Sequence, residues 1–97
     1  MSGSRDRDLD TSGVHFQFMK AELGLCFTFT DVAETSYRLG NAESGDSALK
    51  KAGRGYKTLH QSLEDPRHSR RLTKEEMQLI IHEMQRLLKA LDALHHR

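Results

Sequence analysis

Apolar residues recur every three or four positions through the last third of the chain, a spacing that places them on one face of a helix. Polar and charged residues fill the other face. Thr73 stands before this segment as a capping residue, and Glu76 three positions later completes a capping box. We therefore expect a helix over residues 74–95, whose apolar face holds Met77, Ile80, Ile81, Met84, Leu87, Leu88, Leu91 and Leu94.

The middle of the chain repeats this pattern over residues 42–64. Asn41 or Ser44 is placed to cap the start, and Pro66 ends the pattern because the residue before a proline avoids helical geometry. One face carries Ala48, Leu49, Ala52, Tyr56, Leu59 and Leu63. This helix depends on contacts with its neighbours, because it contains three glycines that weaken an isolated helix but allow a close approach: Gly45, Gly53 and Gly55.

Residues 14–39 allow two interpretations. Residues 14–18 and 26–30 alternate with a period of two and are rich in Phe and Thr, which is typical of two short strands. Residues 19–23 between them are strong helix formers without a turn signal, and Gly40 stands where the end of a helix favours a left-handed residue. We expect one long helix over 14–39, and two short strands are the alternative.

On a helix over 14–39, apolar residues form stripes on two nearly opposite sides. What we call the core stripe consists of Phe16, Met19, Leu23, Cys26, Phe27, Ala33 and Tyr37. What we call the outer stripe consists of Val14, Phe18, Ala21, Leu25, Phe29, Val32 and Leu39. A helix in a three-helix bundle meets both neighbours on one side, so the bundle can bury only one of these stripes.

We expect another chain to cover the outer stripe, because a long exposed apolar surface marks an interaction site. The simplest partner is a second copy related by a two-fold axis, and another helical protein is the other candidate. Two alternatives stay open: residues 41–47 and the N-terminal residues wrap the stripe, or strand pairing explains the alternation. The predicted interface comprises Val14, Phe18, Ala21, Leu25, Phe29 and Val32.

The length of 97 residues predicts one domain with one small core. Residues 1–13 are polar apart from Met1 and Leu9, which predicts a flexible tail before a bundle domain over 14–97. The expected fold is all-α, a three-helix up-down-up bundle with a long first helix. Its core should hold Phe16, Met19, Leu23, Phe27, Tyr37, Leu49, Ala52, Tyr56, Leu59, Met77, Ile80, Met84, Leu87 and Leu91.

The formal net charge is only +1, so no overall field attracts nucleic acid or an anionic membrane. Residues 66–74 are the exception, with four basic side chains and no acidic one. We interpret them as a solvated interhelical loop, since no aromatic residue lies among the charges to stack on bases. The alternative is a small nucleic-acid or phosphate contact through Arg67, Arg70, Arg71 and Lys74.

The junction of the first two predicted helices resembles the helix–turn–helix of the tetratricopeptide repeat. In that repeat a Leu-Gly pair ends the first helix, an Ala follows twelve residues after the Gly, and an aromatic residue comes four positions later. The matching residues are Leu39, Gly40, Ala52 and Tyr56. The chain departs from the repeat where Ser36 replaces an aromatic residue and where the proline is displaced to Pro66. A hairpin with a third helix is also similar to the microtubule-interacting and transport domain, and both resemblances imply a binding or scaffolding module.

No pattern of residues points to an enzyme. His82 and Glu83 begin like a zinc-protease motif, but Arg86 stands where the second His is required. Cys26 is the only cysteine and lies among apolar residues, which predicts a buried and unreactive thiol. We expect no catalytic residue, metal or cofactor. The lack of an apolar run that could span a bilayer or serve as a signal peptide predicts a cytoplasmic protein.

Overall fold

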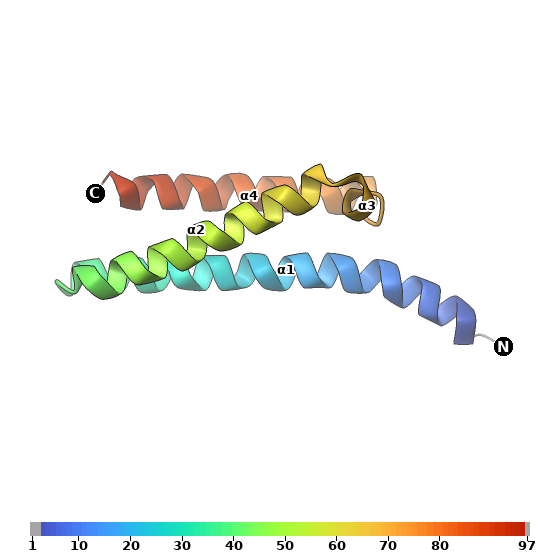
Figure 1. Cartoon of the computed structure of the whole chain (residues 1–97), viewed down its shortest axis with the longest axis horizontal. Coiled ribbons are helices and arrows are strands. Elements are labelled where there is room, and N and C mark those ends of the chain that lie inside the picture. The colour runs from blue at the N-terminus through green and yellow to red at the C-terminus, as the bar shows by residue number, and fades with distance from the viewer. Residues whose placement is uncertain (1–2, 97) are drawn as a thin grey trace.

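The computed structural model describes residues 3–96, which form four helices and no strand (Figure 1). The helices are α1 (Gly3–Arg38), α2 (Ala42–Glu64), α3 (Pro66–Ser69) and α4 (Lys74–His95). The expected all-α fold with a long first helix is confirmed, and the bounds of α2 and α4 agree with the prediction. Within this part of the chain, no helix combines the length and the apolar composition needed to cross a membrane.

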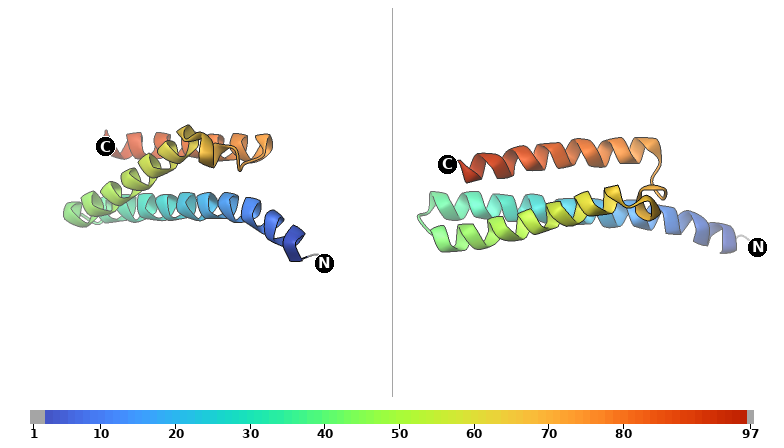
Figure 2. Two further views of the ribbon diagram at one scale, coloured as in Figure 1. Left: turned by 45° about the vertical axis from the view of Figure 1, so that its right-hand side comes forward. Right: turned by 45° about the horizontal axis from the view of Figure 1, so that its top comes forward.

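α1 and α2 form an antiparallel hairpin, and α4 runs back alongside them in the direction of α1 (Figures 1 and 2). The molecule is elongated, with extents of 58 × 22 × 17 Å. The segment expected to be an irregular loop contains α3, so residues 3–96 hold four helices where three were expected. α3 forms because the Asp65 carboxylate accepts the Arg67 backbone N–H at 2.9 Å, and Pro66 takes a first-turn position that needs no N–H.

α1 begins at Gly3, eleven residues before the predicted start at 14, and its first turns project past the rest of the bundle (Figure 1). Residues 3–13, expected to be a tail, thus continue the helix, and residues 1 and 2 lie outside the described part. A formed helix extends at low cost because each further residue adds a hydrogen bond, and no proline interrupts this segment. Residues 14–18 and 26–30 lie inside α1, so the two-strand interpretation is wrong.

The junctions beside the long helices follow the predicted capping signals. Gly40 has φ +82°, and the Asn41 N–H donates to the Ser36 carbonyl at 2.8 Å, which closes α1 with a left-handed cap. Of the two candidate caps for α2, Asn41 is the one used, because its side chain accepts the Ser44 N–H at 3.1 Å. The capping box of Thr73 and Glu76 is also confirmed, with both of its hydrogen bonds present.

One hydrophobic core joins the three long helices. Its buried apolar residues are Met19, Leu23, Cys26, Ala33, Ala48, Leu49, Ala52, Leu59, Ile80, Met84, Leu87, Leu91 and Leu94. The predicted core was too wide, because the aromatic rings lie at the helix seams and are only partly buried: Phe16, Phe27, Tyr37 and Tyr56. Met77 is also only partly buried, and Ile81 and Leu88 on the predicted apolar face of α4 are exposed.

Two glycines of α2 allow α1 to pack closely. A β-carbon at Gly45 would overlap the Tyr37 ring, and one at Gly55 would overlap the Cys26 sulfur. Gly53 faces open space instead, because a β-carbon there would meet no atom within 4 Å. As expected, glycines of α2 allow a close neighbour: Gly45 and Gly55 determine how near α1 and α2 can approach.

Candidate protein interface

The outer stripe of α1 is exposed along most of its length. Val14 is 62% exposed, Phe18 66%, Leu25 54% and Val32 45%, and Leu39 at the helix end is also exposed. The core stripe alternates with these residues along the sequence, and its members Met19, Leu23 and Cys26 are buried. The two stripes therefore have opposite surroundings, as their placement on the helix predicts.

Phe29 differs from the other large residues of the outer stripe. Its ring is only partly exposed and packs against the core, and the Lys51 ammonium of α2 lies 5.6 Å from the ring centroid. Phe29 therefore lies at the edge where the outer stripe meets α2. Ala21, the small member of the predicted interface, is exposed.

A surface groove of about 500 Å³ runs beside this edge. Phe29 and Val32 form its α1 side, and Ala48 and Lys51 are among the α2 residues that form the other side. Asn41 and Ser44, at the start of α2, also line the groove, and they leave Val32 45% exposed. Residues 41–47 therefore do not wrap the outer stripe, whose large side chains stay mostly exposed.

Three of the four phenylalanines lie beneath cations. Lys20 lies 5.4 Å from the Phe16 ring, and Arg86 of α4 lies 5.4 Å from the Phe27 ring, as Lys51 does at Phe29. Such contacts shield part of an aromatic face and add a small attraction. Phe18 is the most exposed of the four, and it lies near the middle of α1.

The basic residues of the 66–74 segment separate into two groups. Arg67 and Arg71 line a hollow together with His68 and with His15 of α1. The other two predicted anion contacts, Arg70 and Lys74, are exposed and are not part of this lining. The structure thus brings two of the four predicted residues together.

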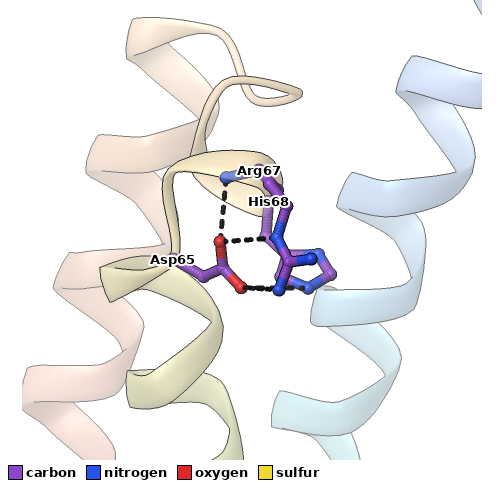
Figure 3. Close-up of polar contacts among 3 residues, drawn as sticks. All are labelled: Asp65, Arg67 and His68. Atoms are coloured by element: carbon purple, nitrogen blue, oxygen red, sulfur yellow. Dashed lines mark hydrogen bonds and ion pairs between the residues drawn. The ribbon is translucent and has the colours of Figure 1, made fainter.

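Asp65, which precedes α3, holds the side chain of Arg67 (Figure 3). Its carboxylate accepts hydrogen bonds from the Arg67 guanidinium, at 3.3 Å from Nε and 3.0 Å from Nη2. These bonds and the Arg67 backbone N–H lower the pKa of Asp65 to about 2. The same carboxylate lies 3.9 Å from His68 Nε2.

The thiol and the imidazole considered for chemistry lie where the sequence placed them. Cys26 is 1% exposed, and burial, with a smaller effect of Glu22, raises its pKa to about 11. A buried thiol with so high a pKa has little thiolate near neutral pH. His82 is exposed, and over the described side chains no group of three or more His, Cys, Asp or Glu is arranged to hold a metal ion.

Sequence reasoning missed the pairing of His15 with His68. The two residues are far apart along the chain, and neither belongs to a motif that would indicate the other. They meet because α2 runs antiparallel to α1 and carries α3, which follows it, back to the part of α1 that contains His15 (Figure 1). Compared with protein-family models, curated proteins and solved structures, this chain has no match, so the resemblance to the tetratricopeptide and microtubule-interacting hairpins stays a prediction.

Proposed function

We propose that this chain is a non-enzymatic protein–protein interaction module, which forms a two-fold homodimer through the outer stripe of α1. The observation that carries the proposal is the exposure of Val14, Phe18, Leu25 and Val32 along the face of α1 opposite the buried core stripe. In this proposal the three long helices act as an up-down-up bundle that holds the stripe rigid, and the module works in the cytoplasm.

The spacing of the outer stripe supports a second copy as the partner. The steps between its central members are three, four, four and three residues, which is symmetric about Leu25: Phe18, Ala21, Leu25, Phe29 and Val32. When two copies of α1 cross in antiparallel orientation with the two-fold axis at Leu25, Phe18 of each copy faces Val32 of the other. Ala21 then faces Phe29, so a small residue meets a large one, as close packing requires.

The groove beside Phe29 and Val32 supports the same orientation. An antiparallel pairing about Leu25 carries Phe18 of the second copy to this groove, whose apolar lining consists of Phe29, Val32 and Ala48. A protruding aromatic side chain that enters a groove on the partner is typical of the residues that dominate binding energy at protein interfaces.

The outer stripe also lacks ionisable side chains. None of its seven members is charged, although charged residues make up 30% of the chain. Depletion of charge at the centre of a surface distinguishes interfaces from ordinary protein surface, because a buried unpaired charge is costly. From Val14 to Leu39 this uncharged face is about 37 Å long at 1.5 Å per residue.

Light scattering coupled to size-exclusion chromatography tests the self-association. We expect a mass of twice the 11.1 kDa of one chain at micromolar concentration. Leu25→Asp should yield the monomer with unchanged helicity by circular dichroism, because Leu25 is exposed in the single chain. Phe29→Asp is a poorer choice, because Phe29 also packs against the core.

Gln17→Asp is the matched control. It adds the same charge to an exposed position of α1 outside the outer stripe, so the dimer should persist. A wild-type chain that stays monomeric, or a Leu25→Asp variant that stays dimeric, would show that the outer stripe is not a homodimer interface.

Cysteine cross-linking tests the orientation separately. With a short bismaleimide, Leu25→Cys should cross-link to itself across the two-fold axis. Phe18→Cys alone should not, whereas a mixture of Phe18→Cys and Val32→Cys chains should. In a parallel dimer each position faces the same position of the other copy, so Phe18→Cys alone would cross-link and the mixture would give no Phe18–Val32 cross-link. The wild-type chain is the control, since Cys26 is buried.

A further inference from the structure

α1 meets the α3 segment through two stacked imidazole rings. The ring centroids of His15 and His68 are 5.2 Å apart, and their planes are inclined by 6°. These rings, with Arg67 and Arg71, line a hollow of about 350 Å³. Figure 3 shows the side chains of Arg67 and His68 extending from α3 toward α1. The fold therefore builds one basic concave surface from two distant segments.

The positive charge of this hollow is only partly balanced. The carboxylate of Asp65, which is not among the residues that line the hollow, pairs with Arg67 at 3.0 Å and lies 3.9 Å from His68 Nε2. Among the side chains of residues 14–96, no carboxylate forms an ion pair with Arg71. With respect to these side chains, an anion in the hollow would meet at least one guanidinium without an acidic partner.

His15 supplies the α1 side of the hollow. Its Nε2 atom is buried and makes no hydrogen bond within the described part of the chain. Burial, followed by the charges of His68 and Arg71, lowers the pKa of His15. This imidazole thus has an unused polar atom, and its neighbours oppose its protonation.

We propose that the hollow between α1 and α3 binds a phosphate group, either as inorganic phosphate or as a phosphate monoester. The planar fork of Arg71 matches two oxygens of such a group, and Arg67 approaches from the α3 side. A protonated imidazole donates a hydrogen bond from either ring nitrogen, so His15 and His68 can hold the remaining oxygens. This site is independent of the outer stripe, and a monomeric chain should bind phosphate equally well.

Phosphate binding should be linked to proton uptake. Within residues 14–96, the charged and titratable groups that face His15 are His68 and Arg71, and Arg67 and Asp65 lie beside them. A dianion among these groups favours the protonated imidazoles and raises the pKa of His15. Sulfate is a useful second probe because it stays a dianion near neutral pH. Tighter sulfate binding at pH 6 than at pH 8 therefore reports protonation of the histidines and not of the anion.

The experiment is a titration of the full chain with inorganic phosphate, sulfate and O-phosphoserine, followed by NMR of the histidine rings and by calorimetry. Arg71→Gln should weaken binding of each anion about tenfold, which corresponds to the loss of one charge-assisted contact. Arg70→Gln is the matched control, because the neighbouring arginine does not line the hollow, and it should change affinity less than about twofold. Tighter binding of O-phosphoserine than of inorganic phosphate identifies a monoester as the ligand class, and the reverse identifies the free ion.

Two results would overturn the site. Equal weakening by Arg71→Gln and Arg70→Gln would show a diffuse attraction to the basic segment. Unchanged His15 and His68 signals in the wild-type chain, up to the highest phosphate concentration, would show that no anion enters the hollow. His15→Gln serves as a second variant on another helix, and circular dichroism of all three variants shows whether the helices persist. With the helices intact, binding by His15→Gln at the wild-type affinity and the same pH dependence would also contradict the proposal.

Discussion

The two stripes of α1 contain similar residues but have different neighbours. Both hold phenylalanine, leucine and alanine, and they interleave along the same turns of one helix. Leu23 is 5% exposed, and Leu25, two residues later, is 54% exposed. Residue type alone therefore does not decide which stripe the bundle buries.

The difference arises from α2, which packs against one side of α1 only. Gly45 and Gly55 bring the α2 backbone close to Tyr37 and Cys26 of the core stripe. Beside the outer stripe, α2 instead presents Lys51 and the polar residues that line the groove. Small residues on the neighbouring helix thus select the stripe that enters the core, and most of the other stripe stays exposed.

The largest expected effect comes from shortening one leucine on each stripe. Leu23→Ala should lower the free energy of unfolding by about 3 kcal/mol, because it leaves a cavity in the core. Leu25→Ala should lower it by less than about 1 kcal/mol at concentrations where the chain is monomeric. Urea denaturation at low and high protein concentration measures both, and the Leu25→Ala loss should grow with concentration. Equal losses of stability in the two variants at low protein concentration would show that the core stripe and the outer stripe are buried to the same extent.

A smaller effect is expected from two glycines of α2. Gly55→Ala should destabilise the chain by about 1–3 kcal/mol, since the added methyl group meets the Cys26 sulfur. Gly53→Ala should stabilise it by about 0.5–1 kcal/mol, because alanine favours the helix and nothing lies in its way. Thermal unfolding of the pair is the measurement. A stabilising Gly55→Ala would mean that α1 and α2 are further apart than described.

The smallest effect concerns the thiol of the core stripe. The pKa of Cys26 is raised to about 11 from an ordinary value of 9.0, so folding favours the protonated thiol. This stabilisation is fully present below pH 9 and is lost as the pH rises from 9 to 11. Wild-type protein should therefore lose stability over that interval relative to Cys26→Ala, as measured by urea denaturation. If the stability of the two proteins changed equally between pH 9 and pH 11, the pKa of Cys26 would not be raised by burial.

Features that depend on residues a few positions apart were predictable from the sequence. Thr73 and Glu76 define the start of α4, and Gly40 the end of α1, because each capping bond joins near neighbours in the chain. α3 also has such a signal in the Asp65-Pro66 pair, but the charges of this segment led to its interpretation as a loop.

Features that depend on packing between helices were not predictable in the same way. The sequence of α4 shows which residues form its apolar face but not how much of that face its neighbours cover. Ile81 and Leu88 belong to this face and are nevertheless exposed. The contact of His15 with His68 depends on the register between α1 and the end of α2, and no local pattern records that register. The predicted exposure of the outer stripe succeeded because it followed from geometry common to three-helix bundles.

The short turn at Gly40 has a consequence for the rate of assembly. Only three residues separate α1 from α2, and the Tyr37 hydroxyl donates to Asp46 just across the turn. Closing so short a loop costs little entropy, so this hairpin should form quickly and independently of protein concentration. In the homodimer proposed above, pairing of two chains through the outer stripe is a second-order step that follows hairpin formation. Refolding should therefore show a fast phase with a constant rate and a slower phase that accelerates as the protein concentration rises.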